Sequence, residues 1–370
     1  MTSLQGLRLG DYTLNGKISR GAKGCVFLGQ RSNLDMDFIQ SYSGKEGQGQ
    51  NATANFIWAA VKYPANNREV RTMRALLAKP SPCLGVPQIF DSGQYGGKPW
   101  LAMELLGSPL AQTVRELRTR STKQRWMCIC ALGHLLLRRL REVHQRGFVH
   151  CDINDSNIMI GRKYGTAPDR YSPFIVDFGL AHPHPGGEPI HAHAGTIEFN
   201  SIRSTDGGPR LPRDDVEALG WLLCWAFLGD LFWFPWIEEV NWKDKPRRAE
   251  MCKRVQQAKL ALLVPGPQSF EATYPSLPAE MAEYLRLCRR FGGDGDSGEV
   301  ARPDYEALAR LLGGWGLGGV EQDAEDVSLF GRLYEGNSVE LPSIPVQGLT
   351  PSEAGQDERT TSSPDETKRG

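Results

Sequence analysis

Residues 148–160 constrain this chain more than any other stretch, because they concentrate charged and amide side chains between two apolar segments. Asp152 is followed five residues later by Asn157, and Asp177-Phe-Gly comes twenty residues after Asn157, behind a short apolar run. Carboxylate and amide oxygens are preferred ligands of hard cations, so Asn157 and Asp177 are candidate metal ligands. Asp152 is left as a separate carboxylate that could orient a hydroxyl group. The alternative, a chance cluster of Asp and Asn in a surface loop, is disfavoured by the combined spacing.

A glycine-bearing turn lies near the N-terminus, between two strands predicted within residues 10–31. Gly21 and Gly24 carry no Cβ, so the turn's backbone N–H groups can approach phosphate closely. A further strand over 56–63 carries Lys62, an ammonium among apolar neighbours that can neutralise phosphate charge. Glu69, on a helix predicted over 68–79, is the candidate to pair with Lys62. The structural alternatives are a plain hairpin, an edge-strand lysine and a surface glutamate.

The following segments predict a sheet completed by a helical region. Residues 85–107 read as strand, turn and strand, and helices follow over 109–118 and 123–146. The second helix repeats large apolar residues at helical spacing, which predicts the core of a larger lobe and not a cofactor site. These residues are Trp126, Ile129, Leu132, Leu136 and Leu140.

Composition excludes several classes of protein. The 370 residues include 43 basic and 43 acidic side chains, so the net charge does not favour nucleic acid or an anionic membrane as partner. No apolar run is long enough to span a bilayer, and the densest one, residues 221–236, is broken by Gly229 and Asp230 and predicts a buried helix. Eight scattered cysteines include Cys128 and Cys130, which lack a second ligand pair for zinc. We expect a monomer in a reducing compartment, the cytoplasm with the nucleus as a second location.

Three further segments have no regular pattern of apolar residues. Residues 32–55 are polar and predict an inserted loop, and residues 336–370 predict a disordered tail after a short helix over 321–334. Residues 180–199 carry four histidines, for which we favour a loop over a metal site because Pro and Gly interrupt them. The histidines are His182, His184, His191 and His193.

Together these motifs resemble the protein-kinase superfamily, and two of them are similar to signatures of its casein kinase I group. The first is Gly195-Thr-Ile-Glu-Phe-Asn-Ser-Ile and the second is Arg213-Asp-Asp-Val-Glu-Ala-Leu-Gly. The resemblance covers about residues 10–315 and includes Glu104-Leu-Leu-Gly as hinge, with later matches at Tyr274-Pro-Ser, Tyr284-Leu-Arg-Leu-Cys and Arg302-Pro-Asp-Tyr.

The fold implied by this resemblance is α+β with two lobes, a small and mostly β N-lobe and a larger helical C-lobe. We expect an N-terminal extension over 1–9, an N-lobe over 10–104 and a C-lobe over 107–315. A short helix over 316–335 and the tail would follow. Thr350, Ser352 and Ser363 in the tail are candidate autophosphorylation sites, although an inert tail is the favoured alternative.

The activity implied by the resemblance is transfer of the γ-phosphate of ATP, with Mg²⁺, to Ser or Thr hydroxyls of protein substrates. Asp152 would orient the hydroxyl and accept its proton, and Thr196 would hydrogen-bond beside it. Asn157 and Asp177 would hold Mg²⁺. Asp215 would brace the loop from below.

The resemblance also implies a nucleotide site. Lys62 would bind the phosphates, with Glu69 holding it in place. The backbone of Glu104 and Leu106 would hydrogen-bond adenine, and Met103 would close the back of the pocket, although it also fits simple strand core. The residues expected around the nucleotide are Ile18, Gly21, Gly24, Val26, Ala60, Lys62, Glu69, Met103, Glu104, Leu106 and Met159.

The chain departs from the kinase pattern at several positions. Asn154 stands where Ser/Thr kinases carry a lysine, and losing such a charge-stabilising group commonly lowers the rate ~10²–10³-fold. Cys151 replaces the arginine that receives an activation-loop phosphate, and Ser19 replaces the first glycine of the turn. Residues 182–195 contain no Lys or Arg, so a preference for acidic substrates is not carried over.

Two other functions compete with an active protein kinase. A pseudokinase, binding nucleotide or acting as a scaffold, is the main alternative because of Asn154. A small-molecule kinase is disfavoured by the group-specific motifs. We favour the active enzyme because the metal ligands and the Lys62–Glu69 pair are all present.

Overall fold

The computed structural model describes residues 4–21, 24–32, 56–79, 81, 83–162, 168–187, 190, 194–238, 244–291, 302–313 and 320–336. The polar insertion expected over 32–55 lies outside these residues except for Ser32, and the expected tail lies outside them except for Gly336. Within the described ranges, no helix is both long enough and apolar enough to cross a bilayer.

The N-terminal part is a six-stranded antiparallel sheet in the order β1-β2-β3-β4-β6-β5. It contains the strands predicted from sequence and one, β1, that was not predicted. Its strands are β1 (Arg8–Leu9), β2 (Tyr12–Arg20), β3 (Cys25–Ser32), β4 (Phe56–Tyr63), β5 (Ile89–Tyr95) and β6 (Lys98–Glu104).

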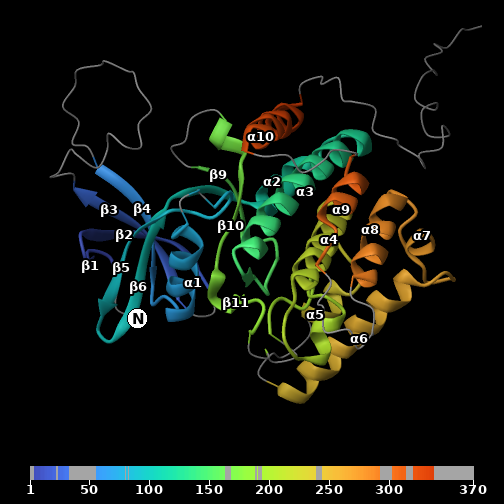
Figure 1. The fold of residues 1–370 in the computed structure, drawn as a ribbon, viewed down its shortest axis with the longest axis horizontal. Coiled ribbons are helices and arrows are strands. Elements are labelled where there is room, and N and C mark those ends of the chain that lie inside the picture. Colours follow the sequence, from blue (N-terminus) through green and yellow to red (C-terminus); the bar gives the residue numbers. More distant parts are fainter. Residues whose placement is uncertain are drawn as a thin grey trace, which may run out of the picture.

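Helix α1 (Asn67–Leu77) lies at the end of this sheet that faces the helical part of the molecule (Figure 1). It begins where the Asn66 side chain accepts a hydrogen bond from the Arg68 backbone at 2.9 Å, a standard N-cap. Met73 and Leu76 are buried on its inner face, and Glu69 is buried with them. A carboxylate on a buried face needs a partner, and Lys62 supplies it.

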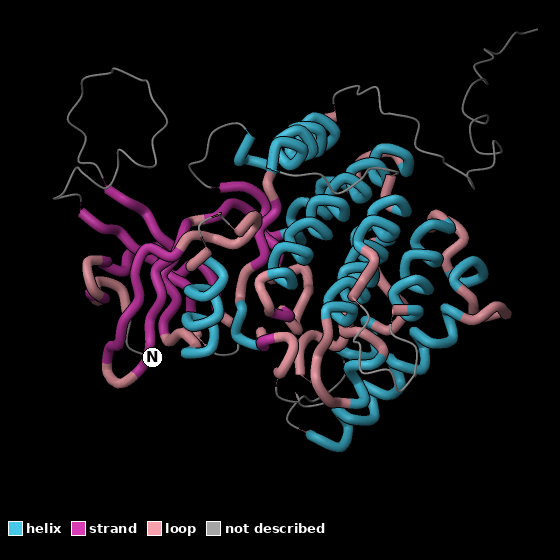
Figure 2. Tube along the Cα trace, in the orientation of Figure 1, coloured by secondary structure: helices cyan, strands magenta, loops and turns pink. Residues whose placement is uncertain are grey.

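The C-terminal part is mainly helical (Figure 2). Of its long central helices, α4 is almost entirely buried and α3 is buried over most of its length, and the five apolar residues expected in the core of α3 are all buried there. Its helices are α2 (Leu110–Leu117), α3 (Thr122–Gln145), α4 (Pro212–Leu228), α5 (Phe234–Glu238), α6 (Lys245–Leu263), α7 (Phe270–Thr273), α8 (Ala279–Arg290), α9 (Tyr305–Leu311) and α10 (Val320–Glu335), with the 3₁₀ helices η2 (Pro168–Tyr171), η3 (Phe178–Leu180) and η4 (Arg203–Asp206).

The apolar stretch 221–236 is not one helix. Helix α4 ends at Leu228 because Gly229 adopts a left-handed conformation with φ of 92°, which glycine tolerates at a helix end. The chain then turns before α5 begins at Phe234. Trp221 and Trp233 come together across this turn with ring centroids 5.5 Å apart.

Two small sheets flank the loop 150–157 and the segment that begins at Val176. Strand β9 (Ile158–Arg162) pairs with β7 (Leu106–Pro109) on one side and with β10 (Pro173–Ile175) on the other. Strand β8 (Phe148–Val149) pairs with β11 (His182–Pro183). The loop 150–157 therefore runs between β8 and β9, and the residues after β10 begin beside it.

Helix α10 extends from Val320 to Glu335, close to the predicted short helix. Its apolar residues Val327, Phe330 and Leu333 are buried in the same hydrophobic core as α3 and α4. Arg138 on α3 forms ion pairs with Asp323 at 2.7 Å and with Asp326 at 2.6 Å. The helix is thus attached to the helical core by both apolar and ionic contacts.

Candidate active site

The centre of the candidate site is a chain of three charged residues from three elements. The Lys62 Nζ atom on β4 lies 2.8 Å from Glu69 on α1 and 3.0 Å from the Oδ1 atom of Asp177. The ion pair expected between Lys62 and Glu69 is therefore present. Asp177 joins it from the helical part, so the cation links the sheet to the segment after β10.

Burial and pairing compete at these three groups. Burial disfavours the charged ammonium, but the two carboxylates outweigh it, so the pKa of Lys62 is raised. Burial raises the pKa of Glu69, and Lys62 offsets this only in part. Burial would also raise the pKa of Asp177, yet the charge of Lys62 prevails and lowers it. Asp177 is therefore ionised at neutral pH and keeps a negative charge beside Lys62.

Asp177 adopts an unusual backbone conformation, with φ of 61° and ψ of 66°. Its Oδ1 atom accepts a hydrogen bond from the Gly179 backbone at 3.2 Å, which closes the turn. The next residue, Phe178, is fully buried and meets the His150 ring edge-on at 4.9 Å. The aromatic contact holds the turn, so the Asp177 carboxylate points toward Lys62 and not into the core.

Asp152 receives hydrogen bonds from residues before and after it in the chain. Its Oδ1 atom accepts from the Thr196 backbone at 2.9 Å, from the Thr196 hydroxyl at 2.8 Å and from the Asn154 amide at 3.0 Å. The Asn157 amide donates to the Asp152 carbonyl at 2.9 Å and to its Oδ2 atom at 3.3 Å. The carboxylate is thus held in one orientation by three residues, of which Thr196 was the one expected to hydrogen-bond beside it.

Asn154 is 4% exposed and uses both ends of its amide within the loop. Its nitrogen donates to Asp152 and, at 2.9 Å, to the Thr196 hydroxyl. Its oxygen accepts from the backbone N–H groups of Ser156 at 2.9 Å and Asn157 at 3.1 Å. Asn154 therefore has a structural role in the loop, which its neutral amide fulfils as both donor and acceptor.

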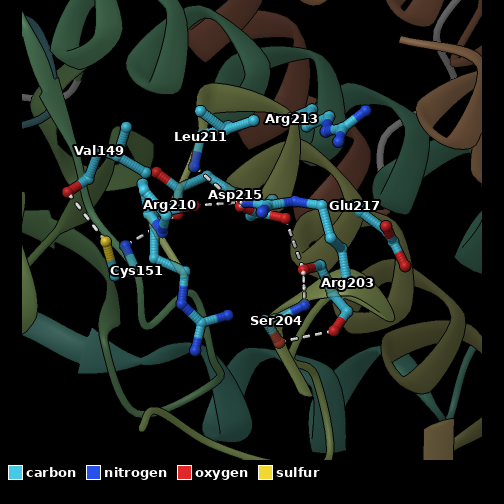
Figure 3. Close-up of polar contacts among 12 residues, drawn as sticks. Val149, Cys151, Arg203, Ser204, Arg210, Leu211, Arg213, Asp215 and Glu217 are labelled. Atoms are coloured by element: carbon cyan, nitrogen blue, oxygen red, sulfur yellow. Dashed lines mark hydrogen bonds and ion pairs between the residues drawn. The ribbon is translucent and has the colours of Figure 1, made fainter. Parts of the chain in front are cut away.

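The loop is anchored from below by Asp215, as expected. Its two oxygens accept from the backbone N–H groups of His150 at 2.7 Å and Cys151 at 2.8 Å. Figure 3 shows Asp215 near Cys151. Burial opposes the charge of Asp215, but hydrogen bonds from His144 and the loop outweigh it, so its pKa is lowered. This anchor permits the positive φ of 70° at Cys151, a conformation that non-glycine residues rarely adopt.

His144 and Tyr305 extend this anchor and were missed in the sequence. The His144 Nε2 atom lies 2.9 Å from Asp215, and its other ring nitrogen contacts the Tyr305 hydroxyl. Tyr305 belongs to a motif that the sequence had highlighted, Arg302-Pro-Asp-Tyr, but its contact is made across 161 residues. Nothing local in the sequence signals that contact.

A glycine is required where the Thr196 turn approaches the loop. Gly195 has φ of +87°, and a Cβ there would lie 2.7 Å from the Asn200 side chain and 3.0 Å from the Cys151 carbonyl. The Asn200 amide also donates to the Ala194 carbonyl at 2.9 Å. The turn can therefore reach Asp152 only with glycine at this position.

Asn157 and Asp177 could hold a divalent cation. The Asn157 nitrogen is used by Asp152, and its oxygen makes no hydrogen bond to the residues that the structure describes. Asp177 bonds through Oδ1, and its side chain is 47% exposed. The Asn157 carbonyl accepts from the Val176 backbone at 2.9 Å, which holds the two residues in adjacent positions. An amide oxygen and a carboxylate, both hard ligands, match the requirements of Mg²⁺.

The glycine-bearing turn differs in detail from the expectation. The Gly21 N–H donates to the Gly24 carbonyl at 2.8 Å, so this donor closes the turn and does not point to a ligand. A Cβ at Gly24 would clash with the Pro64 carbonyl, which gives that glycine a packing reason. Val26 pairs with Lys62 across the sheet, and Ile18 is 49% exposed. The residues between the two glycines lie outside the described ranges.

The remaining nucleotide candidates lie where the sheet meets the helical part. Met103 is buried on β6 opposite Ala60, consistent with strand core. The Glu104 N–H donates to the Gln88 carbonyl at 2.9 Å, so only the carbonyl side of Glu104 fits the expected adenine contact. Leu106 begins β7 in the other sheet. Met159 is half-buried on β9, between β7 and β10.

Of the four histidines, His182 and His184 lie in the described part of the chain, where no group of three or more His, Cys, Asp or Glu could hold a metal ion. The His182 Nε2 atom lies 2.8 Å from Arg68 on α1, and its Nδ1 atom lies 2.5 Å from the Leu180 carbonyl. His182 therefore connects α1 to the segment after Asp177. His191 and His193 lie outside the described ranges.

Comparison with known proteins agrees with this geometry. Residues 105–227 match a family described as fungal protein kinase. Over 250 residues the chain is 31% identical to the human serine/threonine-protein kinase VRK2, a match that covers 63% of this chain and 44% of that relative. The chain thus spans less than half the length of the curated relative it matches. These similarities relate the chain to the protein kinases and imply the two-lobed kinase fold for the sheet and helices described above.

Proposed function

We propose that this protein is an ATP- and Mg²⁺-dependent kinase of the casein kinase I group that phosphorylates Ser and Thr residues of protein substrates. The observation that carries the proposal is the contact of Lys62 with Glu69 and Asp177, together with a separately held carboxylate, Asp152, on the loop to which the segment before Asp177 is hydrogen-bonded. A cation for phosphate, hard ligands for a metal and a carboxylate for a hydroxyl are the parts that phosphoryl transfer requires.

Each residue has a task in this proposal. Lys62 neutralises the nucleotide phosphates, and Glu69 keeps its ammonium in place. Asn157 and Asp177 hold Mg²⁺, which neutralises charge on the phosphates when bound. Asp152 orients the Ser or Thr hydroxyl and accepts its proton, because Thr196 and Asn154 donate to its Oδ1 atom and Asn157 donates to its Oδ2 atom, so the carboxylate keeps one orientation.

The proposal also includes the location and the oligomeric state of the protein. The eight cysteines all lie in the described ranges and none forms a disulfide, which supports a reducing location, the cytoplasm with the nucleus as a second site. We propose a monomer that recognises protein substrates directly.

The experiment is transfer of radiolabelled γ-phosphate from ATP with Mg²⁺ onto randomised peptides that contain Ser, Thr or Tyr as the only hydroxyl residue. Wild type is expected to label the Ser and Thr peptides. Asp152→Asn, which keeps an oxygen to accept from Thr196, is expected to lose at least 100-fold in kcat. Labelling of tyrosine peptides alone would exclude the proposed specificity.

A pseudokinase is the second candidate, favoured by the neutral Asn154 and by the internal use of the Gly21 N–H. It predicts that nucleotide raises the melting temperature of the wild-type protein, while neither wild type nor Asp152→Asn transfers phosphate in the assay. That pair of results would replace the enzyme with a nucleotide-binding protein.

A further inference from the structure

The turn that brings Thr196 to Asp152 is held by donors from distant parts of the chain. Its carbonyl oxygens accept hydrogen bonds from three side chains. One residue lies just before α4, one just before α5 and one on α6. Arg210 donates to Ala194 at 3.2 Å, and the Trp233 indole donates to Glu198 at 3.2 Å. Lys259 donates to Ile197 at 3.3 Å and to Asn200 at 2.8 Å.

Lys259 is the most unusual of these donors, because its amine is buried inside the protein. It is 1% exposed, and no carboxylate of the described residues lies within ion-pair distance of it. Its Nζ atom lies 5.2 Å from the centre of the Trp221 ring and 5.4 Å from that of Trp233. Two carbonyl oxygens and two aromatic faces replace the water that surrounds the amine of an exposed lysine.

The contacts of Lys259 are directed at the residues that determine where Thr196 lies. Within the turn, the backbone N–H groups of Phe199 and Asn200 donate to the Thr196 carbonyl at 3.1 Å and 2.9 Å. Lys259 binds the carbonyls of Ile197 and Asn200. Ile197 directly follows Thr196 in the chain, and Asn200 hydrogen-bonds to Thr196. A shift of either would move Thr196 relative to Asp152.

We propose that Lys259, on α6, is a positioning residue that holds the 194–200 turn so that both donors of Thr196 meet the Asp152 carboxylate. Asp152 and Lys259 do not touch, so the effect passes through Thr196. The inference that this affects catalysis rests on the proposed kinase function, whereas the effect on the turn does not.

The first test measures the turn without any activity. Hydrogen exchange, followed by mass spectrometry, is compared for wild type, Lys259→Met and Lys253→Met. Lys259→Met keeps the apolar stem and removes the amine, and Lys253 is an exposed lysine on the same helix. We expect at least tenfold faster exchange over residues 195–200 in Lys259→Met alone, with exchange over α3 unchanged.

Unchanged exchange over 195–200 would overturn the proposal, and so would an equal increase over α3, because that would mean general destabilisation. If Lys259→Met does not fold, Lys259→Gln, a shorter side chain that keeps an N–H donor, is tested against the same two criteria.

The second test uses kcat and a double-mutant cycle. Lys259→Met is expected to lower kcat at least tenfold while KM for ATP stays within twofold, because Lys62 and Asp177 are untouched. Thr196→Ala, which removes the hydroxyl donor and keeps the backbone N–H, should lower kcat as well, and the double variant should lose less than the product of the two single losses. Independent, multiplying effects would overturn the catalytic part, whereas an inactive wild type would overturn the proposed function and leave the exchange result standing.

Discussion

At the scale of single residues, Lys62 is placed between two carboxylates, one fully buried on α1 and one at the edge of the helical part. Its charge compensates Glu69, which is 1% exposed and has no other cation within ion-pair distance in the described chain. The residue proposed to bind phosphate thus also supports folding.

Substitution of Lys62 by Met is therefore expected to destabilise the protein as well as to abolish nucleotide binding. Removing one partner of a buried ion pair costs roughly 3–5 kcal/mol, because it leaves the other charge unpaired. Urea denaturation measures this loss. Lys62→Met/Glu69→Met should recover most of the stability, while the exposed Lys98→Met changes little. A stable Lys62→Met single variant would contradict the argument.

Asn154 supports a second prediction at this scale. Asn154→Asp keeps the oxygen that accepts from Ser156 and Asn157. It also places a second carboxylate beside Asp152, because in the wild type the Asn154 nitrogen lies 3.0 Å from the Asp152 Oδ1 atom. Like charges at this separation repel, so kcat is expected to fall at least ~10²-fold with KM for ATP little changed. Steady-state kinetics decide this, with the exposed Ser156→Ala as control. Full activity in Asn154→Asp would show that the amide hydrogen bonds are dispensable.

At the scale of elements, α10 is attached to α3 by a buried ionic cluster. Arg138 and Arg139 share Asp323, and Arg138 also binds Asp326. His134 lies beside this cluster, 3.5 Å from Asp326, and is fully buried. The helix that follows the region of kinase resemblance is therefore integrated into the core, although its sequence suggests only a short helix.

This interface should become weaker in acid. Burial lowers the pKa of His134 from 6.5 to about 4, despite the opposing charge of Asp326. Between these values the unfolded chain takes up a proton that the folded protein does not. Stability is therefore complete above pH 6.5 and decreases as the pH falls toward 4, by up to about 3 kcal/mol.

Denaturation curves at pH 7, 6, 5 and 4 test this expectation. His134→Leu should remove this part of the pH dependence, while His184→Leu, at a partly exposed histidine, should keep most of it. Identical pH dependence in wild type and His134→Leu would exclude His134 as the cause.

At the scale of the whole molecule, polar contacts join the sheet to the helical part around the site. Besides the Lys62–Asp177 pair, Asn66 donates to the Gly179 carbonyl at 3.1 Å. Arg146, at the end of α3, donates to the carbonyls of Leu76 and Ser81 at 2.7 Å and 2.9 Å. A ligand that binds Lys62 and Asp177 together should therefore stabilise both parts.

ATP with Mg²⁺, at a hundred times its Kd, is expected to raise the free energy of unfolding by about 2.7 kcal/mol in a single transition. Calorimetry with and without EDTA measures the metal-dependent part. Asp177→Asn should remove that part, since it replaces a charged ligand by a neutral amide. Equal stabilisation of wild type and Asp177→Asn would exclude Asp177 as a metal ligand.

Much of the site was predictable because its signals are local. Asp152 and Asn157 lie within one loop, between β8 and β9, and Asp177 lies in the turn after β10. Both are short-range features of the sequence. The helical spacing of α3 and α10 was readable for the same reason. The break at Gly229 was also readable, but the apolar stretch 221–236 was expected as one buried helix and instead contributes to two, α4 and α5.

The sequence by itself determined the kinds of residue available and their order: a lysine on a strand, a glutamate on the next helix, and three polar residues on neighbouring loops. Only the tertiary structure decided that Asn154 holds Asp152 and Thr196, that Glu104 uses its N–H internally, and that Lys259 reaches the turn from α6. Apart from Asn154 with its near neighbour Asp152, these contacts join residues 16 to 62 positions apart, and His144 with Tyr305 are 161 apart. The physical reason is that packing of whole elements creates them, and no local spacing encodes which distant donor will face a given carbonyl or carboxylate.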